Sequence, residues 1–515
     1  MTELRIVVGS GPNAVAVAHA LLERGFEVAM LDVGATIEPT TAAVVARMAG
    51  QEPTQWSAQD KAIIRRLGFG EEAAVNPKRT FGSSFAYSLD PDIDAPAGMR
   101  LYGSQAFGGL SNVWGCALLR ARPTELAGWP AEVVSDALPA YAKIEDLVRR
   151  TVGTEAFSSR PEGTHLKIAR GANAMLRRFR QSAAEMDARN IYNPLDLYPT
   201  PLAISAACKA CNACMYGCVY GYTYSSRQTV EGLFMRNPRF RYLGGMTVNR
   251  FHETEAEIEV EVLNQRTGGA ETLRAKQLFL AAGLMGTLRI LWRSSPAIAR
   301  TLVAQDSATC IVPGFLPSVR AGMRQHHHGQ SHLSVDLQLP PFADKPAHFQ
   351  LYFNNPAVPD GLKSRLPLLR LAPLQTLLAF ANRYLVFGQG YLHADFCHKL
   401  AMEYRPDGKI AVSVKQNPET VRYLQIALTN FVRDMRALGV VFLQRFADVT
   451  PAGGSKTAGA LPHASVASPT TTDPLGRPLG SRNVFAVDAT VLGSGPAKNL
   501  TMTTMANAYR IGQRA

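Results

Sequence analysis

Residues 4–32 read LRIVVGSGPNAVAVAHALLERGFEVAMLD, and this stretch decides the expected fold. The apolar run at 4–8 predicts a buried strand, the pattern at 15–22 is helical, and the run at 27–31 predicts a second strand that closes on an acid. A strand, a glycine turn, a helix and a second strand in this order begin a dinucleotide-binding sheet. The sequence therefore predicts a parallel α/β sheet near the N-terminus.

The turn and the acid supply the chemistry of the predicted site. Gly9 and Gly11 let the backbone approach a pyrophosphate at the start of the helix, where unpaired N–H groups and the helix dipole attract anions. Ala14 completes the G-x-G-x-x-A pattern, and Asp32 is placed to accept hydrogen bonds from a ribose hydroxyl. A glycine turn without a ligand is the alternative, and the motif alone does not distinguish FAD from NAD.

The composition excludes several other classes of protein. The chain has 515 residues, 46% hydrophobic and 18% charged, and at roughly 150 residues per domain its length predicts two to four domains. It has no apolar run of about 18 residues, so an integral membrane bundle is excluded. The net charge of +13 (54 minus 41) would attract anions, but the basic residues are scattered, and we expect no nucleic-acid partner. The N-terminus lacks a secretory leader pattern, which predicts a cytoplasmic protein, or one exported or held at a membrane by a partner subunit.

Three later segments decide which cofactor is expected. They read QAFGGLSNVWG at 105–115, LFLAAGLMGTLRIL at 278–291 and, at the C-terminus, VFAVDATVL from 484 followed by PAKNLTMTTMANAYR from 496. Together with the N-terminal turn, these motifs resemble the glucose–methanol–choline (GMC) family of FAD oxidoreductases. The resemblance covers about half of the chain in the right order, whereas 301–455 has no matching motif.

The resemblance implies an α/β fold with a Rossmann-like FAD-binding domain assembled from the discontinuous segments 1–130, 206–300 and 456–515. An α+β substrate domain would be inserted as 131–205 and 301–455. Beyond the N-terminal turn, the FAD-site residues that the resemblance implies are Gly108, Gly109, Ser111, Asn112, Val248, Ala282, Gly283, Asp488 and Thr501.

The resemblance also implies a catalytic pair over the flavin ring, which falls on His463 and Asn499. A neutral imidazole can take the hydroxyl proton near neutral pH while hydride moves to the flavin, and Asn can hold the alcohol oxygen. The stretch after His463 reads ASVAS rather than the Gly-Thr usual in the family. A loop histidine without a role is the alternative, and Asn499 could also serve as a helix cap.

Cys208, Cys211, Cys214 and Cys218 form a C-x2-C-x2-C-x3-C run. This is the spacing of bacterial ferredoxin runs, except that Val219 stands where proline usually follows. All four thiolates would hold a 4Fe-4S cluster, whereas a 3Fe-4S cluster would leave one over. Zinc sites usually separate their two cysteine pairs by a longer loop, so an iron–sulfur cluster is favoured over zinc or no metal. Some bacterial sugar dehydrogenases of the GMC family carry such a cluster with a different cysteine spacing.

Two segments carry weaker signals. The histidine-rich run at 326–332 is interpreted as a polar loop or strand rather than a metal site. The apolar segment 363–386 has a basic flank and two prolines, and it suits peripheral contact with a membrane, although a core or dimer-interface helix is the alternative.

These motifs together predict a dehydrogenase that oxidises an alcohol, probably on a sugar or a sugar-containing lipid. Hydride would go to FAD, and electrons would leave through the iron–sulfur cluster to a cytochrome subunit or a quinone. The alternatives are an oxidase that makes hydrogen peroxide and carries a structural zinc, and an electron-transfer flavoprotein subunit without its own substrate.

Overall fold

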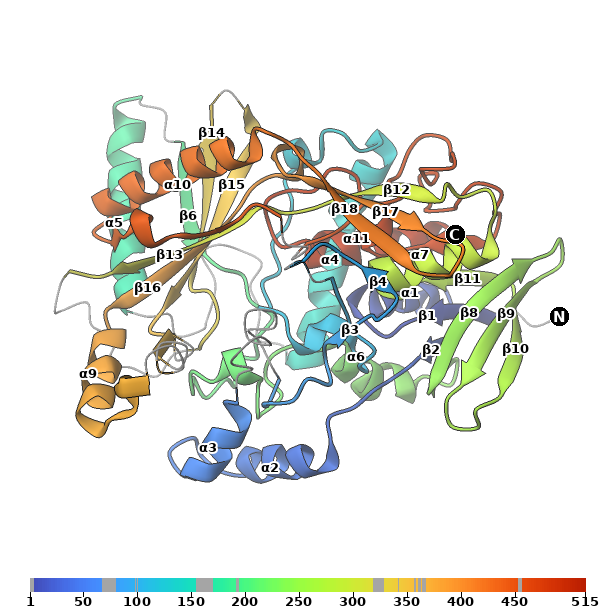
Figure 1. Ribbon diagram of the computed structural model, residues 1–515, viewed down its shortest axis with the longest axis horizontal. Coiled ribbons are helices and arrows are strands. Elements are labelled where there is room, and N and C mark those ends of the chain that lie inside the picture. Colours follow the sequence, from blue (N-terminus) through green and yellow to red (C-terminus); the bar gives the residue numbers. More distant parts are fainter. Residues whose placement is uncertain are drawn as a thin grey trace.

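Two large sheets lie in different parts of the molecule, the parallel one toward the right of Figure 1 and the antiparallel one toward the left. The computed structural model describes residues 4–66, 80–97, 99, 101–153, 170–190, 194–317, 328–340, 342–355, 358–359, 363, 367–452 and 456–515. Parts of the two weaker sequence signals, 326–327 and 364–366, lie outside the described residues.

The parallel sheet contains the N-terminal motif. Its five strands have the order β21-β11-β1-β2-β7. They are β1 (Leu4–Val8), β2 (Glu27–Asp32), β7 (Phe240–Gly244), β11 (Gln277–Leu280) and β21 (Val484–Ala486). Every neighbouring pair is parallel, although the strands come from distant parts of the chain. Because β1 is central, the glycine turn lies in the middle of the edge at which all five strands end, where α/β sheets bind ligands.

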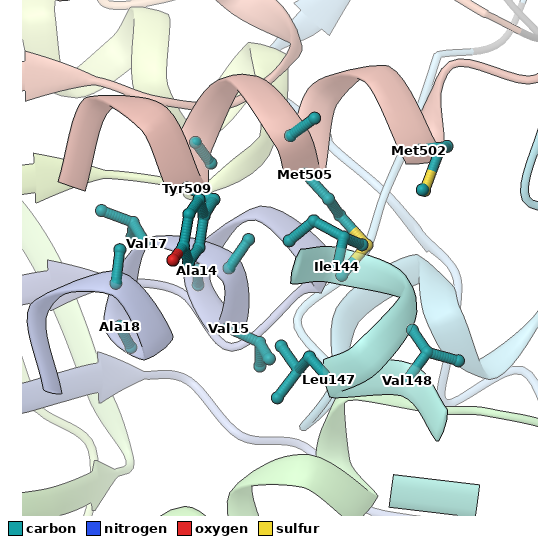
Figure 2. Close-up of a cluster of buried hydrophobic side chains, with 14 of the residues drawn as sticks. Ala14, Val15, Val17, Ala18, Ile144, Leu147, Val148, Met502, Met505 and Tyr509 are labelled. Atoms are coloured by element: carbon teal, nitrogen blue, oxygen red, sulfur yellow. The ribbon is translucent and has the colours of Figure 1, made fainter. Parts of the chain in front are cut away.

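Three helices pack together on one face of this sheet: α1 (Pro12–Glu23), α4 (Ala131–Val152) and α11 (Thr501–Arg514). Figure 2 shows how Val15 of α1, Leu147 of α4 and Met505 of α11 fill the space between them. The predicted helix begins earlier than expected, at Pro12, because a fixed φ suits proline to the first helical position.

α4 packs with the helices of the parallel sheet. It begins the segment 131–205 that is expected in the substrate domain, and its apolar side is buried in the core beside α1 and α11. Twenty-two residues of helix with one continuous apolar side need a partner surface, and the two other helices supply it.

The opposite face of the parallel sheet is covered by α7 (Gly283–Ser294) and by a small antiparallel sheet. The strands of that small sheet are β8 (Met246–Glu253), β9 (Ile258–Asn264) and β10 (Ala270–Ala275). Burial on both faces explains why β1 and β2 are continuous apolar runs.

The antiparallel sheet has the order β19-β13-β16-β15-β14-β6, with β20 also paired to β13. Its strands are β6 (Leu195–Pro199), β13 (Thr309–Phe315), β14 (Leu333–Leu339), β15 (Phe342–Phe353), β16 (Leu385–Tyr391), β19 (Val441–Phe442) and β20 (Asp448–Thr450). The helices α5 (Arg170–Ala188) and α10 (Thr420–Ala437) cover its apolar face (Figure 1). Phe349 of β15 and Phe431 of α10 stack there, with ring centroids 4.0 Å apart.

The other face of this sheet is polar and nevertheless buried. Asp336 lies opposite His348 across β14 and β15, and Ser334 lies opposite Gln350. All four are at most 2% exposed. Buried polar groups need partners, so the segments that cover this face decide its chemistry.

Shorter elements join these parts. A four-stranded sheet of order β12-β17-β18-β4 combines strands from both halves of the chain. Its strands are β12 (Thr301–Gln305), β17 (Lys399–Tyr404), β18 (Ile410–Lys415) and β4 (Ile93–Asp94). The remaining elements include β3 (Ser88–Leu89), β5 (Tyr102–Gly103), α2 (Pro39–Ala49), α3 (Ala58–Ile64), α6 (Ser226–Gly232) and α9 (Ala372–Asn382). The predicted fold class, a Rossmann-like α/β sheet from discontinuous segments with a second α+β part, is confirmed.

Candidate functional site

The glycine turn after β1 has the shape that a pyrophosphate site requires. Gly9 has a φ of +100°, and a Cβ there would lie 2.5 Å from the carbonyl oxygen of Ala281. A Cβ on Gly11 would meet nothing within 4 Å, so the space beside this residue is open. Gly11 precedes α1, and no side chain caps the helix. The N–H groups of its first turn are therefore available to an anion, and the cradle fits the phosphates of FAD.

Asp32 ends β2 beside this turn, but protein groups already engage it. Ser10 Oγ donates a hydrogen bond of 2.5 Å to Asp32 Oδ2, and Tyr242 Oη donates another of 3.0 Å. Burial raises the pKa of Asp32 to about 6, against the lowering effect of these hydrogen bonds. The ribose contact expected of Asp32 stays a prediction.

The segment Gly108–Asn112 lies against the glycine turn. The N–H of Gly108 donates to Ser10 Oγ at 2.8 Å, and a Cβ on Gly109 would come within 3.2 Å of Gly11 Cα. Ser111 Oγ accepts from the N–H of Ser226 at 2.9 Å, and Asn112 Nδ2 donates to the carbonyl of Gly109 at 2.8 Å. The glycines thus adjoin the cofactor cradle, whereas Ser111 and Asn112 hold the segment in shape.

The remaining predicted cofactor residues, apart from Val248, lie at the ends of strands or the starts of helices. Asp488 follows β21 and is buried; it accepts hydrogen bonds from Thr287 Oγ1 at 2.6 Å and from the N–H of Thr490 at 2.9 Å. Ala282 and Gly283 begin α7, and Thr501 begins α11. Val248 of β8 is buried in the apolar cluster beneath the sheet.

His463 is completely enclosed in this half of the molecule. Its Nδ1 lies 2.8 Å from the carbonyl oxygen of Asp473, and its Nε2 lies 3.2 Å from Asn507 Oδ1 and 3.3 Å from Arg510 Nη2. Burial and the Arg510 charge lower the pKa of His463 to about 3. Nδ1–H donates to the carbonyl, so the lone pair on Nε2 faces the guanidinium and is a poor proton acceptor. His463 is not hydrogen-bonded to Asn499 within the described part of the chain, and its surroundings suit a structural role.

Asn499 instead meets the polar face of the antiparallel sheet. Gln350 Nε2 donates a hydrogen bond of 2.7 Å to Asn499 Oδ1, and Tyr352 Oη donates one of 3.1 Å to Gln350 Oε1. The loop before α11 therefore brings the predicted catalytic amide onto β15.

A histidine that no motif marks lies two residues before Gln350, on the same face of β15. His348 Nδ1 is 2.7 Å from Asp336 Oδ1, and both side chains are at most 2% exposed. His348 Nε2 is buried and has no hydrogen-bond partner among the residues that the structure describes. Burial lowers the pKa of His348 below its usual value, although the hydrogen bond that His348 Nδ1–H donates to Asp336 works in the opposite direction. A neutral imidazole oriented by a carboxylate, with its second nitrogen free, is the arrangement of a general base.

A network of charges keeps Asp336 ionised. Lys498, next to Asn499, places Nζ 3.1 Å from Asp336 Oδ2 and 2.8 Å from Glu125 Oε2. Arg122 Nη2 lies 3.0 Å from the same Asp336 oxygen. Burial works to raise the pKa of Asp336, but the His348 hydrogen bond and these cations hold it well below its usual range. Residues 122–125 and 498–499 thus cover the polar face and satisfy its charges.

The four clustered cysteines lie on one loop, and its residues Cys211, Ala213 and Val219 pack against α2 and α3. Ala210 and Asn212, between the first three cysteines, have φ values of +52° and +56°, so the chain turns sharply. Backbone N–H groups point at the sulfurs: Tyr222 donates to Cys218 Sγ at 3.2 Å and Gly329 donates to Cys214 Sγ at 3.4 Å.

The loop carries soft thiol ligands of the kind that iron–sulfur clusters use, and backbone N–H groups lie beside two of the sulfurs. Burial, with smaller contributions from Cys218 and Cys208, raises the pKa of Cys211 to about 11, so only a metal would make the thiolate favourable here. As they stand, no three His, Cys, Asp or Glu side chains of the described ranges are arranged to hold a metal ion. The cluster therefore stays a proposal.

The described part of the histidine-rich run, residues 328–332, lies in a loop. His328 and His332 precede β14, are buried, and stack with ring centroids 4.4 Å apart.

No family model matches the sequence, and no curated protein matches it. Among solved structures, the crystal structure of pyridoxine 4-oxidase from Mesorbium loti superposes on this chain with a TM-score of 0.61 at 13% sequence identity. The superposition covers 100% of this chain and 99% of the pyridoxine 4-oxidase chain. The two chains share a fold. At this identity the likeness establishes the architecture alone.

No sequence motif marks Asp336 or His348, because both lie in the stretch 301–455 that matches no motif. A signal was present: LSVDLQL and AHFQLYF alternate polar and apolar residues, although Asp and His are rarely buried in strands. The pair becomes visible only once the register places the two residues opposite each other.

Proposed function

We propose that this chain is a FAD-dependent enzyme that oxidises an alcohol to a carbonyl, with His348 as the base. The observation that carries the proposal is the buried Asp336–His348 pair beside Asn499, on the face toward which the dinucleotide half of the molecule presents residues 498–499. The fold shared with an oxidase, pyridoxine 4-oxidase, supports an oxidation reaction. The open cradle at Gly11 fits the phosphates of FAD.

In the proposed reaction, His348, Asn499 and Asp336 have separate roles. Bound FAD would accept the hydride that leaves the carbinol carbon. His348 Nε2 takes the hydroxyl proton as the C=O double bond forms, so one proton and one hydride leave the alcohol. Asn499, whose Oδ1 accepts from Gln350, is left with its amide N–H groups to donate to the substrate oxygen. Asp336 keeps the proton of the neutral imidazole on Nδ1 and stabilises the imidazolium that forms.

A sugar, or a lipid that carries one, is the substrate class that suits this face. Thr200, Ser334 and Gln350 are buried polar residues around the pair. Thr200 and Ser334 hydrogen-bond each other, and Gln350 bonds Asn499. These hydroxyl and amide groups keep further hydrogen-bonding capacity, which the many hydroxyls of a sugar can use.

The test is anaerobic reduction of the flavin by each of four alcohols: D-glucose, myo-inositol, glycerol and pyridoxine. Reduction is measured as the loss of flavin absorbance. For any alcohol that reduces the wild type, His348→Gln should slow the reduction by about 10²- to 10⁴-fold. The exposed variant His252→Gln is the matched control and should be unchanged.

The outcomes distinguish the candidates. If His463→Gln abolishes flavin reduction and His348→Gln does not, the base is His463 and our assignment is wrong. Flavin that no alcohol reduces would support a subunit that only passes electrons. Hydrogen peroxide formed in proportion to turnover in air would support an oxidase.

We further propose that Cys208, Cys211, Cys214 and Cys218 hold an iron–sulfur cluster, which would let electrons leave one at a time to a cytochrome subunit or a quinone. The spacing and the N–H donors at the sulfurs support this. Protein purified without air should contain about three or four irons per flavin with matching sulfide, and Cys211→Ser should lower that content. The control is Cys310→Ala, a buried cysteine of the antiparallel sheet. Zinc, or no metal, in the wild type would contradict the proposal.

A further inference from the structure

α9 is an apolar helix that the described part of the chain leaves largely uncovered. Leu377 is 62% exposed and Phe380 is 50% exposed, while Leu368 and Leu371, in the turn just before the helix, are 73% and 56% exposed. Figure 1 shows α9 projecting at the lower left, away from both sheets. These four side chains and their helix are called the α9 surface below. Contiguous exposed apolar side chains of this size mark a site of contact with another molecule or a membrane.

The stretch of sequence that contains the α9 surface carries only basic charges. The sequence has no acidic residue between Asp360 and Asp395. The basic residues of this interval are Lys363, Arg365, Arg370 and Arg383. An apolar helix with a basic flank is complementary to an anionic bilayer, since apolar side chains enter the interface and cations meet lipid headgroups.

The length of α9 allows the helix to lie on a membrane but not to cross it. An 11-residue helix is about 16 Å long, roughly half the hydrocarbon core of a bilayer. Within the described ranges, no helix has the length and apolar character needed to span a membrane.

α9 is linked to the cysteine loop by hydrogen bonds through Asn354. Asn382, the last residue of α9, is 5% exposed and donates to Asn354 Oδ1 at 2.9 Å. The carbonyl of Asn354 in turn accepts from Asn212 Nδ2 at 2.9 Å, and Asn212 lies between Cys211 and Cys214.

A second chain of hydrogen bonds also links α9 to the cysteine loop. Asn382 Nδ2 also donates to the carbonyl of Asn355 at 3.3 Å, and Asn355 Nδ2 donates to the carbonyl of Gly329 at 3.2 Å. The N–H of Gly329 donates to Cys214 Sγ. Two short chains of buried hydrogen bonds thus fix the helix relative to the sulfurs.

We propose that the α9 surface docks on an anionic lipid bilayer and that the cysteine loop thereby faces a quinone dissolved in that bilayer. The docking itself rests on exposure and charge. The electron route rests on the proposed function, because a quinone gains two electrons and two protons only if the alcohol has first reduced the protein.

Docking is tested by cosedimentation of the whole protein with vesicles of phosphatidylcholine alone and of equal parts phosphatidylcholine and phosphatidylglycerol. We expect binding to the anionic vesicles that weakens with salt. The double variant Leu377→Ser, Phe380→Ser should lower the partition coefficient by about tenfold or more. Val466→Ser removes an equally exposed apolar side chain elsewhere, 77% exposed, and should leave binding unchanged.

A second measurement separates docking from the proposed reaction. The rate of flavin reduction by alcohol in solution should be the same in the double variant and the wild type. The rate of flavin reoxidation by ubiquinone in anionic vesicles should be lower in the double variant than in the wild type. Absent vesicle binding, or binding that the double substitution does not change, would overturn the proposal. So would a wild-type dimer that dissociates in the double variant, because α9 would then be an interface between two copies.

Discussion

His463 and His348 show how strongly the surroundings decide the chemistry of a single residue. Both are buried, and burial lowers the pKa of each. His463 faces the Arg510 guanidinium with the nitrogen that would take a proton, whereas His348 is held by a carboxylate and keeps Nε2 free. Only His348 combines a neutral ring with an available lone pair.

The pH dependence of flavin reduction should reflect this. Because the pKa of His348 lies below its usual 6.5, the ring is neutral at pH 7 and becomes protonated only as the pH falls further. We expect the rate of reduction to be level through neutral pH and to decline below pH 6.5. Stopped-flow measurements across this range check it, and an acid limb that lies above the usual histidine pKa would contradict the assignment.

Gly9 and Gly11 form a matched pair of variants. Gly9→Ala places a Cβ 2.5 Å from the Ala281 carbonyl at a φ of +100°, so we expect it to lower the free energy of unfolding by more than about 1 kcal/mol. Gly11→Ala meets nothing within 4 Å and should leave the stability of the flavin-free protein unchanged. It would, however, occupy the cradle, so flavin retention should fall. Urea unfolding and flavin content after gel filtration separate the two effects.

At the scale of elements, the antiparallel sheet has one apolar face and one polar face, and each has its own role. α10 and α5 bury its apolar face and make it rigid, so the polar face can hold charged groups in fixed positions. The same strands supply both faces, because successive side chains point to opposite sides. His348 and Gln350 therefore depend on how Phe349 packs.

Phe431→Ala tests that dependence. The ring of Phe431 is completely buried and stacks on Phe349, so its removal should cost about 3–5 kcal/mol in the free energy of unfolding. Val421→Ala, a 43% exposed position on the same helix, should cost little. Equal effects of the two substitutions in denaturant unfolding would show that α10 does not support the sheet.

At the scale of the whole molecule, the cofactor site is assembled from segments that are far apart in the sequence. The parallel sheet joins strands that begin at residues 4, 27, 240, 277 and 484, and the segment 498–499 connects it to the polar face. A ligand bound at such a junction stabilises all of these contacts at once.

Removal of FAD should therefore lower the melting temperature. At a thousandfold excess over its dissociation constant a ligand contributes about 4 kcal/mol, which is a shift of several degrees. Thermal unfolding of the holoprotein and of the same preparation stripped of flavin checks this. Identical melting temperatures would mean that FAD does not bind at this junction.

Features set by short-range interactions were predictable from the sequence. The strand at 4–8, the glycine turn and the following helix depend on local apolar periodicity and on the φ angles that glycine permits, so the structure confirms them nearly residue by residue. The cysteine run was recognisable for the same reason, since its spacing lies within eleven residues of chain.

Only the tertiary structure decided which groups meet. Asp336 and His348 are brought together by strand register, Lys498 and Glu125 by the packing of two distant segments, and Asn382 reaches the cysteine loop through Asn354. Contacts between distant residues depend on how whole elements pack, and local patterns carry little information about that packing. The sequence by itself determined a dinucleotide fold and a thiol-rich loop, while the proposed proton acceptor and the outward face of α9 emerged only from the folded chain.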